Sequence, residues 1–270
     1  MMQHLIVPVD GSDASWRATD AACSLARRCD ATVEIVEIVF DKAEESESRG
    51  RVSERMAQHD TDGLDVSTTT ILTDDGVADA LAERIEAQPD AMFVMSSHGR
   101  GRSAALLGSV TEELLQLTFG PVLVVGPHVA AAGFDGPIVV AVDGSKASES
   151  VLSLAAAWGL ELGVEPWIVE VSEAMPGDSG DVAESAYPAR LARQLAADSG
   201  HPAQFDVLHG KDVHDVVADF AESLHSSMIV ASTHGRTGLA RFVIGSTAAA
   251  MVRHARCPVL LVRPPHLVHD

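Results

Sequence analysis

The sequence predicts an α/β protein with two tandem, doubly wound, parallel five-stranded sheets. Three observations lead to this fold class. Blocks of sequence occur twice in the same order, each copy alternates short runs with segments of helical spacing, and the short runs are almost continuously apolar. Such strands are buried on both faces, as in parallel sheets covered by helices. Right-handed crossover connections then make each sheet doubly wound.

An internal repeat divides the chain into two copies. Asp-Gly-Ser at residues 10–12 returns 133 residues later. Five segments match five others in order: 5–12 with 138–145, 36–38 with 169–171, 92–100 with 228–236, 108–109 with 245–246, and 121–125 with 258–262. A repeat this long indicates tandem domains. We expect a first half at residues 1–128, a linker at 129–135 and a second half at 136–266.

Each element of the first half follows from local signals. Residues 5–9 form an apolar run that ends at Asp-Gly-Ser, which is typical of a buried strand before a turn. Ser12 or Asp13 then caps a helix that continues to Cys29. Strands rich in β-branched residues and helices alternate from there, with strands at 33–40, 66–72, 91–95 and 121–125 and helices at 44–59, 77–87 and 109–117. The second half repeats this order.

Composition excludes several classes of protein. The chain has 270 residues, 39 of them acidic and 19 basic, for a net charge of −20, and 46% are hydrophobic. This is a globular composition, and its acidity disfavours nucleic-acid and anionic-membrane partners. We find no signal-peptide pattern and no apolar run of the ~18 residues that a membrane span needs. Three cysteines without close spacing predict no disulfide framework, so we expect a cytoplasmic protein.

Candidate binding residues gather where the predicted strands end. Asp10 and Asp143 follow the first strand of each half, and Ile38 and Val171 lie at the ends of the second strands. A loop then joins the fourth strand to the last helix in each half. Ligands of doubly wound sheets bind outside the carboxyl ends of the strands, where the strand order reverses. These positions are therefore the candidate ligand sites.

The two loops have the features of a phosphate cradle. Gly99 and Gly235 let the backbone turn and approach an anion closely. Gly-Ser at 108–109 and at 245–246 begins a helix whose first amides lack intrahelical partners, and these amides and the helix dipole attract anions. Each loop also carries an arginine. The alternative is that Gly-Ser merely caps a helix and the glycines shape the loop.

Asp10 and Asp143 suit a different part of a ligand. A carboxylate repels phosphate, so both should face a neutral donor such as a ribose hydroxyl or an adenine amine. The alternative is an Asp-Gly-Ser turn that caps the next helix.

The repeated blocks resemble the universal stress protein family in its tandem-domain form. The resemblance covers essentially the whole chain and rests on residues 7–12, the His-Gly-Arg blocks at 98–100 and 234–236, the Gly-Ser pairs, and Pro-Val-Leu-Val at 121–124. It implies a Rossmann-like fold similar to that of adenine nucleotide alpha hydrolases, with ATP or ADP as the ligand. A nucleotide of charge about −4 on an acidic protein would also bring Mg²⁺.

The resemblance implies a set of nucleotide-binding residues. The two aspartates would contact adenine or ribose, the backbone at Ile38 and Val171 would read the adenine edge, and the helix starts would hold phosphates. The full set is Pro8, Val9, Asp10, Ile38, Ser96, Gly99, Arg100, Gly108, Ser109 and Val110 in the first half, and Ala141, Val142, Asp143, Val171, Ser232, Gly235, Arg236, Gly245, Ser246 and Thr247 in the second.

Two departures separate the chain from the family's nucleotide-binding signature, which is Gly, two residues, Gly, nine residues, then Gly-Ser. Ser96 and Ser232 replace the first glycine. The second half has the nine-residue spacing, whereas the first half is one residue short. A serine Cβ crowds the ribose or the first phosphate, and a shorter loop reaches less far. The signature therefore fits the second half better.

We favour a non-enzymatic stress-response module that binds ATP or ADP and whose partner reads the nucleotide state. The alternatives are a slow ATPase and a nucleotide-free interaction scaffold. The resemblance also implies that the fifth strands, at 121–125 and 258–262, pair with each other and that two chains associate as a homodimer.

The twelve histidines are not assigned to a metal site. His209 and His214 flank a loop, and His266 and His269 lie in a polar tail. At both places solvated side chains are the simpler interpretation.

Overall fold

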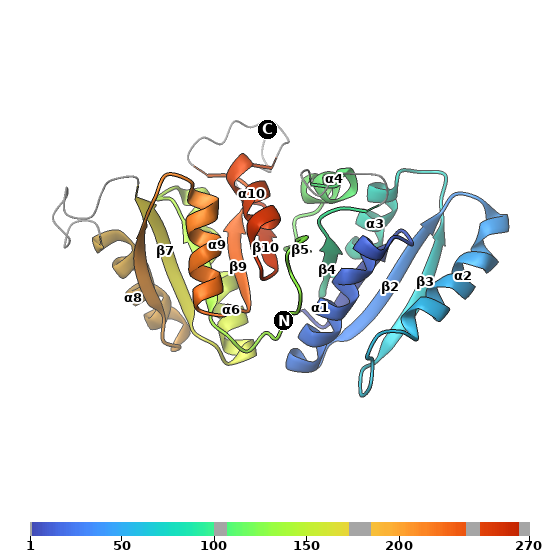
Figure 1. Cartoon of the computed structure of the whole chain (residues 1–270), viewed down its shortest axis with the longest axis horizontal. Coiled ribbons are helices and arrows are strands. Elements are labelled where there is room, and N and C mark those ends of the chain that lie inside the picture. The colour runs from blue at the N-terminus through green and yellow to red at the C-terminus, as the bar shows by residue number, and fades with distance from the viewer. Residues whose placement is uncertain (1, 100–106, 173–184, 236–243, 265–270) are drawn as a thin grey trace.

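The computed structural model of the chain describes residues 2–99, 107–172, 185–235 and 244–264 (Figure 1). The first half contains β1 (His4–Val9), α1 (Asp13–Cys29), β2 (Thr32–Val39), α2 (Lys42–Met56), β3 (Val66–Leu72), α3 (Val77–Glu86), β4 (Ala91–Ser96), α4 (Ser109–Leu117) and β5 (Val122–Val125). The second half contains β6 (Ile138–Val142), α5 (Lys146–Glu149), α6 (Leu152–Leu162), β7 (Pro166–Ser172), α8 (Ala186–Ser199), β8 (Gln204–His209), α9 (Val213–Ser223), β9 (Met228–Ser232), α10 (Ser246–His254) and β10 (Val259–Val262).

The strands form one continuous sheet in the order β3-β2-β1-β4-β5-β10-β9-β6-β7-β8. Within each half all neighbouring strands run parallel, so each half has the predicted five-stranded parallel sheet. The two units join where β5 pairs antiparallel with β10, with Leu123 opposite Leu260. The central strands of the ten-stranded sheet are therefore the last strand of each half.

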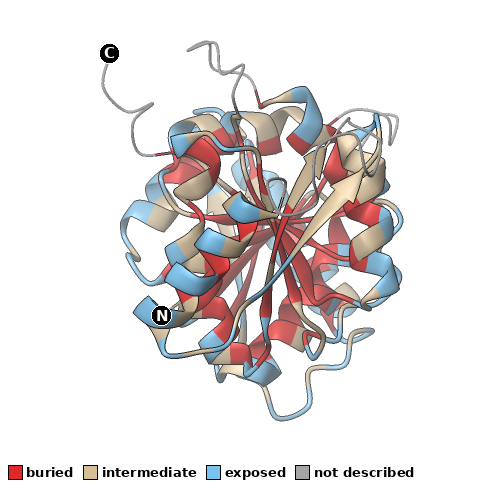
Figure 2. Ribbon diagram, turned by 90° about the vertical axis from the view of Figure 1, so that its left-hand side faces the viewer, coloured by how far each residue is buried: buried red, intermediate tan, exposed pale blue. Residues whose placement is uncertain are grey.

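Helices cover both faces of the sheet (Figure 2), and each of the two buried cores contains residues of both halves. One core contains residues of α1, α2, α6 and α8, and the other contains residues of α3, α4, α9 and α10. Strand alternation supplies both cores, since Leu5 and Val7 belong to the first and Ile6 to the second. This double coverage explains why the strands are apolar at successive positions.

Side-chain caps fix where α1 and α2 begin. Ser12 caps α1 and its side chain accepts a hydrogen bond from the amide of Ser15. Helix α2 begins at Lys42 rather than at the predicted Glu44, because the Asp41 carboxylate accepts from the amide of Ala43 and caps the helix there. Gly11 has φ of 80° and Gly144 φ of 82°, left-handed conformations that favour glycine in the turn before each first helix.

The linker packs against the protein. Phe134 is fully buried in the core that contains α1 and α6. Directly after the linker, Gly136 lies so close to the backbone carbonyl of His225 that a side chain there would collide with it. The linker thus occupies a defined position between the two halves.

All three cysteines are free thiols. Burial raises the pKa of the Cys257 thiol to about 12 and that of Cys23 to about 11. Within the described part of the chain, no helix combines the length and apolar character needed to cross a bilayer.

Candidate functional site

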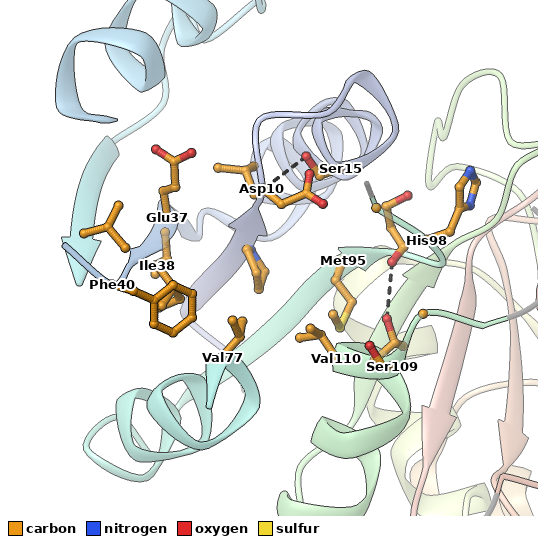
Figure 3. A pocket seen from close by; sticks show the side chains of 18 of the residues that line it. Asp10, Ser15, Glu37, Ile38, Phe40, Val77, Met95, His98, Ser109 and Val110 are labelled. Atoms are coloured by element: carbon orange, nitrogen blue, oxygen red, sulfur yellow. Dashed lines mark hydrogen bonds between the residues drawn. The ribbon is translucent and has the colours of Figure 1, made fainter. Parts of the chain in front are cut away.

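A cavity of about 430 Å³ opens at the carboxyl ends of β1, β2 and β4 in the first half (Figure 3). The strand order reverses between β1 and β4, which is where a doubly wound sheet leaves a crevice. All the first-half residues of the predicted nucleotide-binding set that the structure describes line this cavity: Pro8, Val9, Asp10, Ile38, Ser96, Gly99, Gly108, Ser109 and Val110. Arg100 lies outside the described residues.

Asp10 and Asp143 occupy identical turns at the ends of β1 and β6. The amide and hydroxyl of Ser12 both donate to Oδ1 of Asp10, over 2.9 and 2.6 Å. Ser145 does the same to Asp143, over 3.0 and 2.6 Å. The carboxylates therefore order the turn before the first helix, as the alternative interpretation expects, and Asp10 also lines the cavity.

The carboxylate of each aspartate also lies against a glycine of the loop that follows the fourth strand. A Cβ at Gly99 would collide with Oδ2 of Asp10, and one at Gly235 would collide with Oδ2 of Asp143. Neither glycine has a positive φ. The close approach of each aspartate therefore favours a residue without a side chain at these two positions.

The last helix of each half is tied to the end of the preceding strand. The amide of Gly108 donates to the carbonyl of Ser97 over 2.7 Å, and the amide of Gly245 donates to that of Thr233 over 2.8 Å. These bonds close the loop and bring the first turn of α4 to the cavity, where Ser109, Val110 and Thr111 line it. Gly108 and Gly245 make no side-chain cap, so the first amides of α4 and α10 receive no bond from a capping side chain.

The two serines that replace glycine fit their backbone but differ in their contacts. Ser96 ends β4 and Ser232 ends β9, and neither has a positive φ, so the chain does not need a glycine there. The hydroxyl of Ser232 donates to the carbonyl of His234 over 2.7 Å. The hydroxyl of Ser96 is buried in the wall of the cavity and has no hydrogen-bond partner among the described residues.

Sequence reasoning missed a charged group in the cavity wall. Glu37 of β2 is 5% exposed and accepts a hydrogen bond from Ser48 of α2. Arg51 of α2 lies 3.4 Å from the same carboxylate. The signal was present, because Val36-Glu37-Ile38 recurs as Val169-Glu170-Val171, but only Ile38 and Val171 received a role.

His98 forms part of the same wall. Its Nδ1 is 3.0 Å from the hydroxyl of Ser97, and the matching pair Thr233 and His234 has the same distance. Burial lowers the pKa of His98, the positive charge of Arg17 lowers it further, and Asp10 opposes both effects. The imidazole is therefore neutral at pH 7.

The two ends of the cavity differ in chemistry (Figure 3). Glu37 lies beside the end of β2, and Ser109 and Val110 lie across the cavity at the start of α4. Between the two ends Ile38, Phe40, Val77 and Met95 form an apolar part of the wall, which Asp10, Ser96 and His98 also line. Such a site accepts hydrogen-bond donors at one end, a flat apolar group in the middle and an anion at the other end.

The second half repeats the arrangement as far as the structure describes it. Ala141 and Val142 end β6, Val171 lies near the end of β7, and Gly245, Ser246 and Thr247 cap or begin α10. The contact between Gly235 and Asp143 brings the residues that follow β9 close to the end of β6. Arg236 lies outside the described residues.

Comparisons with known proteins agree on one family. A family model described as the Universal stress protein family matches residues 1–126 and 136–263. A universal stress protein of Mycolicibacterium smegmatis is 32% identical over 218 residues, which are 76% of this chain and 71% of that protein. One of Mycobacterium tuberculosis is 31% identical over 185 residues, 64% of this chain and 61% of that protein.

A solved structure agrees on the fold. The crystal structure of a universal stress protein from Archaeoglobus fulgidus has a TM-score of 0.75 at 19% identity, and the match covers 97% of this chain and 99% of that one.

Proposed function

Because the chain belongs to the universal stress protein family, we propose that its first half binds an adenine nucleotide, ATP or ADP, in the cavity at the ends of β1, β2 and β4. The proposal depends on one observation. The uncapped start of α4 and the buried carboxylate of Glu37 line the same cavity, with apolar side chains between them. Family membership alone leaves the ligand undefined, and the cavity supplies its chemistry.

The charges of the cavity favour one orientation of the nucleotide. The phosphates belong at the first turn of α4, where Ser109, Val110 and Thr111 present amides and hydroxyls. The adenine belongs between Val77 and Phe40, where Glu37 and the carbonyls at the end of β2 accept from its amine. Asp10 then faces the ribose. Mg²⁺ would neutralise part of the phosphate charge beside this acidic surface.

Ser96 gives a second reason to expect a polar ligand. A buried hydroxyl without a partner costs about 1–3 kcal/mol, and a ribose or phosphate oxygen at this wall would remove that cost. The serine that departs from the family's signature thus becomes a contact to the ligand.

We extend the proposal to the second half, with Asp143, Ser232, Gly235, Gly245 and Ser246 in matching roles. Each half, at 1–128 and 136–266, then acts as one nucleotide-binding domain. The protein serves as a sensor, because bound nucleotide stabilises one conformation or assembly of the chain and a partner reads that state. Hydrolysis is not part of this role.

The test uses one substitution that spares the fold. Ser109→Asp places a carboxylate at the start of α4, where it stabilises the helix by about 0.3–1 kcal/mol and repels phosphate. We expect at least a tenfold loss of ATP affinity in the first half and unchanged affinity for adenosine. Calorimetric titration of the full chain, stripped of ligand, measures both.

The matched control is Ser246→Asp, which changes the equivalent position of α10 and leaves first-half binding intact. Mass spectrometry of ligands released from the gently purified protein gives the occupant directly. The proposal is wrong if the wild-type chain binds no adenine nucleotide, or if the double variant binds ATP as the wild type does. The former result would favour the nucleotide-free scaffold.

A further inference from the structure

Two histidines and an aspartate meet where α9 packs against α10. His214 and Asp215 are the second and third residues of α9, and His254 is the last residue of α10. Nδ1 of His254 lies 2.6 Å from Oδ1 of Asp215, and Nε2 of His214 lies 3.6 Å from the same oxygen. The two imidazole rings are perpendicular, with centroids 4.8 Å apart. We call these three residues the His-Asp-His cluster.

The cluster rests on rigid elements. Below it, Val217 and Ala221 of α9 and Met251 and Val252 of α10 belong to one buried core. All three side chains project from helices whose relative position this core holds, and such positions keep ligand geometry better than loops do. The donor atoms already lie within 4.8 Å of one another.

The cluster is open to an incoming ion. The side chains of His214, Asp215 and His254 are 25%, 48% and 45% exposed. Asp215 and His254 line a cavity of about 700 Å³, whose wall also contains His128, the acidic Asp219 and Glu222, and the basic Arg253 and Arg256. Within this wall, the carboxylate of Glu222 forms an ion pair with Arg256 over 3.1 Å.

The equivalent helices of the first half lack the two histidines of the cluster. Asp79 stands at the third position of α3, as Asp215 does in α9. The two histidine positions are Ala78 and Leu117 in the first half. The repeat therefore offers the same backbone with and without the two imidazoles.

We propose that the His-Asp-His cluster binds a borderline divalent transition metal, with Zn²⁺ as its best match. Imidazole nitrogen and carboxylate oxygen are typical Zn²⁺ ligands, whereas Mg²⁺ and Ca²⁺ take sites made of oxygen. Zn²⁺ holds such ligands at about 2.0–2.2 Å, which sets neighbouring donor atoms ~3.3 Å apart. The cluster reaches this spacing if His254 moves ~0.7 Å away from the carboxylate oxygen of Asp215, His214 moves ~0.3 Å toward it, and the two imidazole nitrogens, which lie within 4.8 Å of each other, come closer together.

Binding replaces a proton with the metal ion. A carboxylate only accepts hydrogen bonds, so the contact with Asp215 places the ring proton of His254 on Nδ1, and Zn²⁺ at Nδ1 requires that proton to move to Nε2 through solvent. No bond to carbon and no electron transfer is involved. Three protein ligands leave the fourth position of a tetrahedral site to water from the cavity.

The test is Zn²⁺ titration of the full chain, washed free of metal and without nucleotide, in competition with a chromophoric chelator at pH 7.5. We expect one Zn²⁺ per chain at the cluster and at least a hundredfold weaker binding in His214→Ala/His254→Leu. That variant carries the residues of the equivalent first-half helix positions, so the fold is retained. Zn²⁺ should also raise the Tm of the wild type and leave that of the variant unchanged.

Two controls make the result specific. His4→Gln removes a histidine that contacts Thr32 in the first half and should bind Zn²⁺ as the wild type does. Mg²⁺ at the same concentration should not compete. Equal Zn²⁺ affinity and stoichiometry in the wild type and the double variant would overturn the proposal, as would a wild-type chain that binds no Zn²⁺. Neither result depends on nucleotide binding.

Discussion

At the scale of single residues, the most constrained positions of the site are the two glycines that lie against an aspartate. Gly99 contacts the carboxylate that also orders the turn after β1. One small residue thereby connects the first strand, the first helix and the loop that leads to α4. The proposed nucleotide depends on all three, because they bring the ribose contact and the phosphate contact to one cavity.

We predict that Gly99→Ala reduces ATP affinity in the first half by at least tenfold. The new methyl group displaces Asp10 or the loop, at a cost of about 1–3 kcal/mol in the free energy of unfolding. Titration calorimetry and urea unfolding measure the two effects. Gly235→Ala is the control, since it makes the same change in the second half. An alanine variant with wild-type affinity and stability would contradict the close contact with Asp10.

A second prediction concerns the ionisation of His98. Its pKa is lowered on folding, so between the ordinary value of 6.5 and the lowered value the unfolded chain binds more protons than the native protein. The free energy of unfolding should therefore fall as the pH drops through this range. The free energy of unfolding of His98→Gln, measured by urea unfolding, should fall less over the same pH range.

Nuclear magnetic resonance tests the same point directly. The midpoint of the His98 titration should lie below 6.5 in the ligand-free protein and rise when a phosphate-bearing ligand binds nearby. A midpoint at or above 6.5 without ligand would show that burial and Arg17 do not control this imidazole.

At the scale of the elements, caps and packing hold the helices where sequence propensity is weak. Helix α2 is polar and buries only Ser48, Val52 and Met56. Its position depends on the Asp41 cap and on the contacts of Ser48 and Arg51 with Glu37. This helix therefore supports the buried carboxylate of the cavity as well as the edge of the sheet.

We predict that Gly50→Ala stabilises the chain by about 0.5–1 kcal/mol. Gly50 is an exposed residue inside α2, and a Cβ there meets nothing within 4 Å, so alanine gains helix propensity without a clash. Urea unfolding measures the change. Gly63→Ala should act in the opposite direction, because Gly63 has φ of 75°. Destabilisation by Gly50→Ala would mean that α2 needs the glycine.

At the scale of the whole molecule, the two halves share their sheet and both of their cores. The antiparallel pair of β5 and β10 continues the hydrogen-bond ladder, and the helices of each face form one core across the junction. Arg28 of α1 also donates to the carbonyl of Leu162 in α6 over 2.6 Å. The halves should therefore unfold together.

We predict that Gly126→Ala weakens this junction. A Cβ at Gly126 would collide with the carbonyl oxygen of Val252 in α10, at a cost of about 1–3 kcal/mol. Gly120→Ala at the other end of β5 is the matched control, because a Cβ there meets nothing within 4 Å. Urea unfolding distinguishes them. Equal stability of the two variants would show that the junction tolerates a wider gap.

Much of the site could be predicted because its parts are local patterns repeated twice. The Asp-Gly-Ser turns and the Gly-Ser helix starts are specified by neighbours within five residues, and the strand ends follow from periodicity. Glu37, Arg51 and Phe40 were missed as lining residues, because their place in the cavity depends on how α2 packs on β2. The contact between Gly99 and Asp10 was missed for the same reason, because it joins two segments that are far apart in the sequence.

Local sequence patterns predict the α/β class, the duplication, the Ser12 cap and the edge of the sheet at which a ligand site would form. Hydrophobic periodicity and short-range hydrogen bonding encode these features within a few residues. Packing between distant segments places Glu37 and Asp10 in one cavity and brings His214 and Asp215 to His254. Those contacts join distant segments, and side-chain packing between helices and strands sets their distances.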